Sequence, residues 1–140
     1  MTSGQRQRFY SGGPWEQAVG YSRATRVGDQ IYISGCTAMK DGGLVGKGDP
    51  AAQARQTILT IEGALVGLGS SLSDVVRYRV YLTRIADWEA VAPVLATAFG
   101  DVHPANTLLA VSALINPGML IEIEADAIAG SARPVGEIRK

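Results

Sequence analysis

Hydrophobic and polar residues alternate strictly near the end of the chain, between residues 120 and 129. The apolar positions are Ile121, Ile123, Ala125, Ala127 and Ala129, and the positions between them are Leu120, Glu122, Glu124 and Asp126. A period of two is typical of a strand that packs one face against a core. Like charges at alternate positions lie only about 7 Å apart, so the acidic face needs an explanation.

Further segments have the pattern of strands. Residues 104–129 as a whole predict two strands, joined by a loop that contains Asn116-Pro117-Gly118. Residues 21–27 and 30–35 predict a hairpin, because a Gly28-Asp29 connection suits a type II′ turn. Residues 6–10 predict a short strand, whereas residues 11–15 and the glycine-rich residues 37–48 are expected to be loops.

Residues 74–83 predict another strand. The pattern places Val76, Tyr78, Val80 and Leu82 on its apolar face, and Arg77, Arg79 and Tyr81 on the opposite face.

Two segments have helical periodicity. Asp49 and Pro50 predict a helix start, and Gly69 predicts its end. The apolar stripe between them is Ala51, Ala54, Ile58, Ile61, Leu65 and Leu68. A second helix is expected over residues 87–99, with the stripe Trp88, Val91, Leu95 and Phe99. Because Pro93 removes a hydrogen bond, either this helix is kinked or its regular part begins near Val91.

These elements predict an α+β fold in a single domain, residues 1–130, followed by a C-terminal tail, residues 131–140. Two helices can cover only one face of a mixed sheet of about six strands. The other face is expected to hold both charged and apolar side chains: Arg77, Arg79, Glu122, Glu124 and Asp126 with Leu108, Leu114, Leu120 and Ile128. So mixed a face indicates partial burial, and a symmetric homo-oligomer would supply it.

Composition narrows the classes of protein. The chain has 140 residues, 46% of them hydrophobic, and thirteen basic residues balance thirteen acidic ones. This neutrality argues against a nucleic-acid partner, and no apolar run is long enough to cross a membrane. The N-terminus lacks the apolar region of a signal peptide, and the single Cys36 fits a reducing compartment. We therefore expect a cytoplasmic protein.

Two glycine-containing segments resemble cofactor-binding motifs but do not meet the requirements of those motifs. Lys47 in the glycine-rich segment is followed by Gly48 rather than Ser or Thr, so the segment is not a phosphate-binding loop. Gly67 and Gly69 end a helix instead of opening one, which excludes a dinucleotide fingerprint. His103 is the only histidine, so we expect no metal site and no cofactor.

Five segments, taken in order, resemble the RidA/YjgF family of imine and enamine deaminases, whose older label is L-PSP endoribonuclease. They are GYSRATRVGDQIYISG at 20–35, GDPAAQARQTILTIEGALVGLG at 48–69, DVVRYRVYLT at 74–83, FGDVHPANT at 99–107 and LIEIEADAIA at 120–129. The resemblance implies a chorismate-mutase-like fold and a homotrimer with clefts between subunits. It also implies hydrolysis of imines, such as 2-iminopropanoate, to a ketoacid and ammonia.

The resemblance also assigns roles to residues, and one of them differs here. In deaminating members an arginine follows Pro-Ala and binds the substrate carboxylate, but this chain has Asn106 there, followed by Thr107. An amide supplies no positive charge, which costs about one to two decades of binding to an anion. Glu122 matches the glutamate that holds the attacking water. The alternative is that Glu122 only pairs with Arg77 or Arg79 on a neighbouring strand.

The remaining candidates come from the hairpin. Tyr21 matches a tyrosine that lines the cleft, although it could equally be a strand residue whose hydroxyl reaches water. Ser34 and Gly35 match the segment whose backbone lines the substrate pocket. Cys36 could face the same cleft, but without an evident base it has the features of a small buried thiol. Trp15 and Glu16 are placed to close over the cleft.

Three hypotheses about function follow. The first is an imine or enamine hydrolase of altered specificity, with Glu122 as the catalytic residue and Tyr21, Ser34, Gly35, Cys36, Asn106 and Thr107 as the substrate-binding residues. The second is a non-catalytic protein that binds a small ligand in the same cleft. The third is an endoribonuclease, which the neutral charge and the lack of a histidine pair disfavour.

Overall fold

The computed structural model describes residues 4–132 and 136–139. One six-stranded sheet forms the body of the molecule, in the order β1-β2-β3-β8-β6-β7. These strands are β1 (Arg6–Phe9), β2 (Ala24–Val27), β3 (Gln30–Cys36), β6 (Val75–Leu82), β7 (Ala105–Ala110) and β8 (Ile121–Ile128). All neighbours are antiparallel except β6 and β7, which are parallel. The predicted mixed sheet of about six strands is confirmed.

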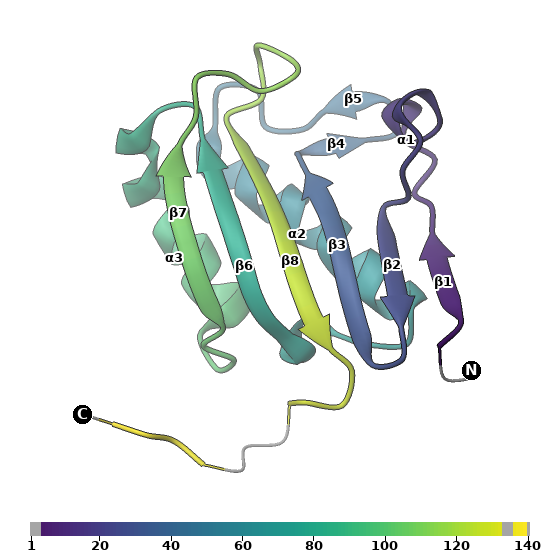
Figure 1. Ribbon diagram of the computed structural model, residues 1–140. Coiled ribbons are helices and arrows are strands. Elements are labelled where there is room, and N and C mark those ends of the chain that lie inside the picture. Colours follow the sequence, from purple (N-terminus) through teal and green to yellow (C-terminus); the bar gives the residue numbers. More distant parts are fainter. Residues whose placement is uncertain (1–3, 133–135, 140) are drawn as a thin grey trace.

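The two long helices, α2 (Pro50–Gly67) and α3 (Trp88–Phe99), lie on the same face of the sheet (Figure 1). The opposite face is open in the single chain. Short elements complete the fold: α1 (Pro14–Val19), the small hairpin of β4 (Met39–Lys40) and β5 (Gly43–Leu44), and the 3-10 turns η1 (Leu72–Asp74) and η2 (Ile85–Asp87). None of the helices in the described ranges is both long and apolar enough to cross a lipid bilayer.

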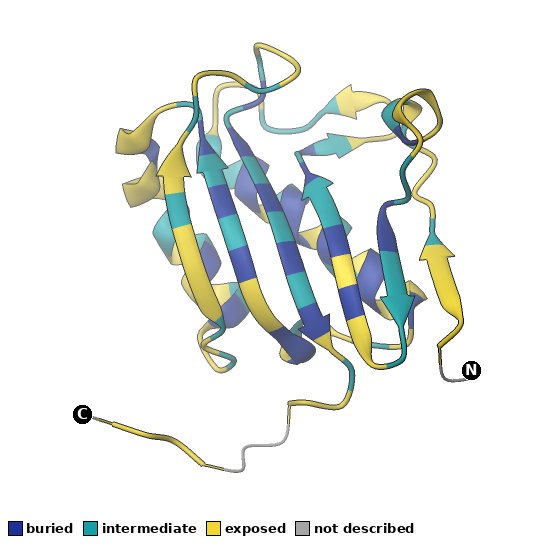
Figure 2. Ribbon diagram, viewed as in Figure 1, coloured by how far each residue is buried: buried dark blue, intermediate teal, exposed yellow. Residues whose placement is uncertain are grey.

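The alternating pattern of β8 is confirmed. Ile121, Ile123 and Ala125 are completely buried against the helices, and Ala127 is 2% exposed. The intervening residues up to Asp126 are only partly buried, which Figure 2 shows as a banded strand between β3 and β6. A central strand with one apolar face therefore fixes which side of the sheet the acidic residues occupy.

The hairpin of β2 and β3 also has the predicted connection. Val27 pairs with Gln30, and of the two residues between them only Gly28 has a positive φ, 61°. This combination of signs is that of the expected type II′ turn.

The prediction for β6 was wrong at Val76, which is 37% exposed, whereas Val75 is 3% exposed. The register between β6 and β8 shifts between Val75 and Arg77. Such a bulge adds one residue to a strand and reverses the alternation before it. Leu108 was also misplaced: it pairs with Val80 and packs on the core side of the sheet rather than on the open face.

Helix α2 begins and ends as predicted. The Asp49 side chain accepts a hydrogen bond from the backbone N–H of Ala52 at 3.1 Å. At the other end Gly69 has a φ of 79°, and the N–H of Ser70 donates to the carbonyl of Leu65 at 2.8 Å. These contacts satisfy backbone groups that a helix end leaves unpaired.

Helix α3 runs from Trp88 through Pro93 to Phe99, so it begins before Val91. Val91, Leu95 and Phe99 are buried as predicted, but Trp88 is 48% exposed. A helical side chain points back toward the N-terminus, and for the first residue of a helix that direction leads past its end. This explains why Trp88 does not join the apolar stripe.

The expected loops contain short elements. Pro14 and Trp15 begin helix α1, and β4 and β5 pair within residues 37–48. Six helical residues and strands of two residues are too short to produce a readable period. The predicted tail, residues 131–140, includes residues 133–135 and 140, which lie outside the described ranges.

Candidate functional site

A cavity of about 610 Å³ lies at one end of the sheet. It is bounded by residues 11–15, the end of β3, the β4–β5 hairpin and the beginning of β8. Its walls include Tyr21, Arg23, Gly35, Cys36, Lys40 and Glu122, and the apolar Trp15, Val19, Met39 and Ile115. This volume falls within the range of sites that bind small molecules.

Glu122 lies on the open face of β8, opposite Tyr81 of β6. Among the described residues, the carboxylate of Glu122 has no hydrogen-bond donor and no ion-pair partner, whereas its backbone belongs to the paired strand. Two arginines were expected to compete for it: Arg79 instead contacts Asp126 at 3.4 Å, and Arg77 lies opposite Asp126. In the single chain, Glu122 is therefore not an ion-pair partner of the neighbouring arginines.

The environment of Glu122 raises the pKa of its carboxyl group. Burial is the main cause, the charge of Glu124 adds to it, and the charge of Arg23 acts in the opposite direction. A carboxylate that is poorly solvated and unpaired is a better base than one in water. Glu122 can therefore accept a proton from a water molecule in the cavity.

Gly35 lies directly against this carboxyl group. A Cβ atom at Gly35 would be 2.9 Å from Cδ and from Oε2 of Glu122, closer than real contacts allow. The register between β3 and β8 shifts between Ile33 and Cys36, so the chain around Gly35 departs from regular pairing. Glycine and the irregular register together let the backbone of β3 approach Glu122.

Arg23 lies in the cavity wall, although the sequence pattern did not identify it as a site residue. It is only 7% exposed. Its Nη1 donates to the carbonyl oxygen of Gly35 at 2.6 Å and approaches Sγ of Cys36 at 3.6 Å. Its Nη2 donates to the Tyr21 hydroxyl at 3.3 Å, and the guanidinium carbon lies 5.4 Å from the centre of the Tyr21 ring.

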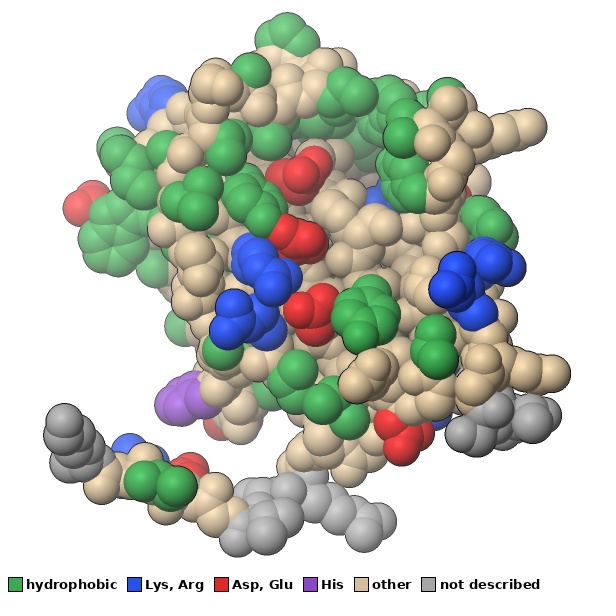
Figure 3. All heavy atoms as spheres, in the orientation of Figure 1, with side chains coloured by type: hydrophobic (Ala, Val, Ile, Leu, Met, Phe, Trp, Pro, Cys, Tyr) green, Lys and Arg blue, Asp and Glu red, His purple; other side chains and the backbone are tan. Residues whose placement is uncertain are grey.

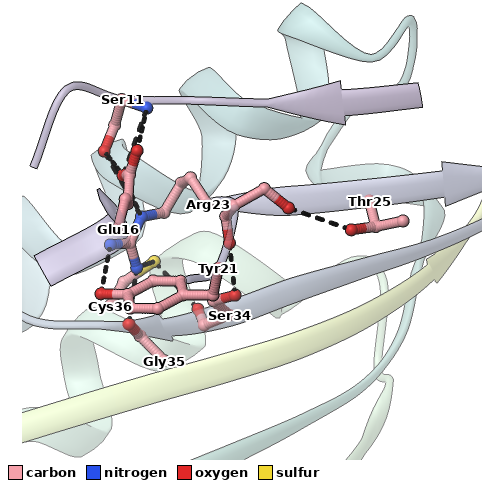
Figure 4. A network of polar contacts seen from close by, with 9 residues as sticks. Ser11, Glu16, Tyr21, Arg23, Thr25, Ser34, Gly35 and Cys36 are labelled. Carbon is pink, nitrogen blue, oxygen red and sulfur yellow. Dashed lines mark hydrogen bonds and ion pairs between the residues drawn. The ribbon is translucent and has the colours of Figure 1, made fainter. Parts of the chain in front are cut away.

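Glu16 of helix α1 holds the other edge of the guanidinium (Figure 4). It is 4% exposed, and its Oε2 lies 3.4 Å from Nε of Arg23. Ser11 also donates to Glu16, from its backbone N–H at 3.1 Å and from its hydroxyl. Burial alone would raise the pKa of Glu16, but the Ser11 hydrogen bonds and the charge of Arg23 outweigh it and lower the pKa. A charged carboxylate therefore anchors the N-terminal segment at the cavity.

Arg23 directly precedes β2, and Arg26 lies within it and caps helix α2 by donating to the carbonyl of Leu68 at 2.7 Å. Neither arginine was singled out by the sequence pattern. Only the path of the chain brings Glu16, Arg23 and Gly35 together. The expectation that Trp15 and Glu16 close over the cleft is met in part, since Trp15 lines the cavity while Glu16 points to Arg23.

The Cys36 thiol is 1% exposed and contacts the carbonyl of Ser34 at 3.2 Å. Burial raises the pKa of this thiol to about 11, although Arg23 acts to lower it. The thiol is therefore neutral near pH 7, which is unsuited to nucleophilic attack. Ser34 itself points away from the cavity, because its hydroxyl donates to the carbonyl of Ser22 at 2.7 Å.

Asn106 and Thr107 do not line this cavity. Both belong to β7, the edge strand, and β6 separates them from β8. Asn106 pairs with the buried Tyr78 and donates to its carbonyl at 3.3 Å, so it lies on the helix side of the sheet. Glu122 lies on the open side. One chain alone therefore does not bring Asn106 and Glu122 together.

The open face itself is charged along its middle. Figure 3 shows acidic side chains in a line along β8, with basic side chains beside them over β6, and a hollow near the upper end of the line. Exposed hydrophobic side chains also lie on this face: Tyr32, Leu109 and Ile128 are 50%, 39% and 40% exposed. In the described residues no group of three His, Cys, Asp or Glu side chains could hold a metal ion.

The fold and the cavity define an α+β protein with a pocket of small-molecule size at the end of its sheet. A family model described as Endoribonuclease L-PSP matches residues 14–129. The chain thus belongs to this family, which is the RidA/YjgF family.

Relatives extend over most of the chain. The crystal structure of Rv2704 from Mycobacterium tuberculosis, a member of the YjgF/YER057c/UK114 family, has a TM-score of 0.82 and 45% identity, covering 89% of this chain and 100% of that one. Protein SCO2049 of Streptomyces coelicolor is 36% identical over 131 residues, 94% of this chain and 98% of that protein. The 3-aminoacrylate deaminase RutC of Acinetobacter baylyi is 36% identical over 104 residues, 74% and 82% of the two chains.

The contact between Gly35 and Glu122 yields a test of the site. We expect Gly35→Ala to keep the free energy of unfolding within about 1 kcal/mol of wild type, because the new methyl group meets only the flexible end of a side chain. The same methyl group displaces the carboxylate, so any reaction that uses Glu122 should slow by about tenfold or more. Urea unfolding and turnover assays measure the two effects. Loss of stability with unchanged turnover would contradict this account.

The raised pKa of Glu122 predicts a dependence of stability on pH. A carboxyl with a higher pKa in the folded state binds its proton more tightly there, so its contribution is lost as the pH rises through that value. We therefore expect Glu122→Gln to raise the thermal midpoint at pH 7.5. The gain should vanish below about pH 4, where the glutamate is neutral in both states. A gain that persists at low pH would assign the effect to packing instead of charge.

Proposed function

We propose that this protein hydrolyses small imines or enamines to a carbonyl compound and ammonia, with Glu122 as the catalytic residue. The observation that carries the proposal is an unpaired, partly buried carboxylate at the wall of a cavity, with glycine backbone against it. Membership of a family that includes a deaminase of 3-aminoacrylate, an enamine, supports the reaction class.

The reaction needs one proton acceptor that later returns the proton. Glu122 takes a proton from water while the water oxygen attacks the carbon of the C=N bond. Nitrogen, which carries the negative charge after attack, takes this proton from Glu122 and a carbinolamine forms. Glu122 then accepts the proton of the new hydroxyl and passes it to nitrogen as the C–N bond breaks, so that ammonia leaves and the C=O bond forms. An imine and water thus give a carbonyl compound and ammonia, and the carboxylate is restored.

We further propose that the protein acts as a homotrimer in the cytoplasm, with the cavity completed by a neighbouring copy. The open sheet face carries Tyr32, Leu109 and Ile128 exposed beside partly paired charges, a combination that a second copy would bury. A neighbouring copy is also the way in which an Asn106 side chain could reach a Glu122. The specificity then differs from that of members with arginine at this position, because an amide offers hydrogen bonds without charge.

Endoribonuclease activity has less support, although the family description names it. The chain has one histidine, and its basic and acidic residues are equal in number. RNA cleavage would use a pair of residues that act as acid and base, and a basic surface that binds phosphates.

Removal of the catalytic carboxylate tests the proposal. Glu122→Ala should lower the rate of ammonia release from enzymatically generated imines by about 10²- to 10⁴-fold, while the oligomeric state stays unchanged. The matched control is Glu124→Ala, because Glu124 lies on the same face and accepts a hydrogen bond from the Tyr81 hydroxyl. Ligand binding without ammonia release in the wild type would favour the non-catalytic alternative, and RNA cleavage that survives Glu122→Ala would favour the nuclease.

A second substitution tests the role of position 106. We expect Asn106→Arg to raise kcat/KM about 10- to 100-fold for imines that carry a carboxylate, through a charge-assisted pair in a cleft between copies. Imines without a carboxylate should gain little. Asn106 is exposed on an edge strand, so the larger side chain is tolerated. If the variant keeps the wild-type oligomer yet gains nothing, position 106 does not face substrate.

A further inference from the structure

The cavity contains a guanidinium of its own, although the chain lacks the arginine expected at position 106. Arg23 and Lys40 are the two cationic residues in its wall. Lys40 is an exposed residue of the short strand β4, whereas Arg23 is 7% exposed and held on several sides. A buried, oriented guanidinium is suited to binding a carboxylate, because fewer of its conformations are lost when an anion binds.

The contacts of Arg23 leave one edge of the guanidinium available. Of its five N–H donors, those of Nη1 point to the Gly35 carbonyl and to Cys36 at 2.6 and 3.6 Å, and Nε points to Ser11 and Glu16 at 3.4 Å each. Within the described residues, Nη2 has only the Tyr21 hydroxyl as an acceptor, at 3.3 Å. One of its N–H groups is therefore open to a ligand.

The surroundings of Nη2 also favour access. A Cβ atom at Gly13 would lie 3.9 Å from Nη2, and glycine leaves this approach to the cavity open. The Tyr21 oxygen accepts from Nη2 and keeps its own hydrogen to donate. Nη2 and the Tyr21 hydroxyl thus present two adjacent donors, which match the two oxygens of a carboxylate.

Gly35 lies between this pair of donors and Glu122. Its carbonyl contacts Nη1 of Arg23, and its Cα side faces the Glu122 carboxyl group. The two functional groups therefore approach one glycine from two sides. In an α-imino acid the carboxylate is bonded directly to the carbon that water attacks. The group that binds the carboxylate and the base that activates the water must therefore lie close together, as Arg23 and Glu122 do on two sides of Gly35.

We propose that Arg23, together with the Tyr21 hydroxyl, binds the carboxylate of a small α-imino acid and places its C=N carbon beside Glu122. This inference rests on the proposed function and names the class of its substrate. The apolar wall formed by Val19, Met39 and Ile115 is suited to a short aliphatic side chain.

The test uses pyruvate, which is the ketoacid product of the simplest such imine, and pyruvamide, which has a similar size and no charge. Calorimetric titration should show pyruvate binding weakened about tenfold or more in Arg23→Gln and about three- to tenfold in Tyr21→Phe. Pyruvamide binding should change less than about twofold in both variants. Lys40→Gln is the control, because it removes a charge from the same cavity wall and should affect pyruvate little.

Arg23→Gln also removes a buried ion pair, so Glu16→Gln provides an independent arm that keeps the arginine. It removes the carboxylate that competes for the guanidinium, and pyruvate should then bind about two- to fivefold more tightly. A purely structural role for the Glu16–Arg23 pair predicts weaker binding instead. Weaker or unchanged binding in a folded Glu16→Gln variant, equal losses for pyruvate and pyruvamide, or a larger loss in Lys40→Gln would each overturn the inference.

Ammonia release separates this inference from the proposed function. If pyruvate binding depends on Arg23 but no ammonia is released from 2-iminopropanoate, the carboxylate site is supported and the hydrolase activity is contradicted. If ammonia release depends on Glu122 but its KM is the same in Arg23→Gln as in wild type, the hydrolase activity is supported and the carboxylate site is contradicted.

Discussion

The hydrogen bond from Arg23 to the carbonyl of Gly35, 2.6 Å long, joins the parts of the molecule that form the cavity. Through Arg23 it ties helix α1 and its Glu16 to the start of β2 and to the irregular end of β3. Gly35 in turn lies against Glu122 of β8. A buried guanidinium paired with a buried carboxylate needs acceptors for most of its remaining donors. Here a backbone carbonyl, a thiol and a phenol accept from Nη1 and from one N–H of Nη2, and the second N–H of Nη2 has no acceptor among the described residues.

The site is placed where the sheet is least regular. β8 is a central strand whose apolar face is buried, so the backbone position of Glu122 is fixed. The register shift in β3 frees the backbone at Gly35 from pairing and lets it line the cavity. A rigid strand for the acid and an irregular neighbour for substrate access are both needed, because a regular pair would fill this space with side chains.

The charges of the site conflict with one another in a way that favours reactivity over stability. Burial and Glu124 raise the pKa of Glu122, and Arg23 offsets only part of that effect. A structure selected for stability alone would pair Glu122, as it pairs Arg79 with Asp126. An ionisable group kept unpaired in a cavity is a frequent property of functional sites.

The sequence by itself determined the elements with a clear period or a clear end signal: the two-sided strand β8, the β2–β3 hairpin with Gly28, and helix α2 between Asp49 and Gly69. It also placed Glu122 on the face away from the helices, since alternation depends only on local geometry. The exposure of Trp88 follows from its place at the first residue of α3, and helix α1 is too short to have a readable period. The bulge at Val75 was decided by pairing with the distant strand β8, which leaves no local signal. The same holds for Arg23: only the tertiary structure brings it beside Glu16 and Gly35, because burial and charge pairing depend on the path of the whole chain.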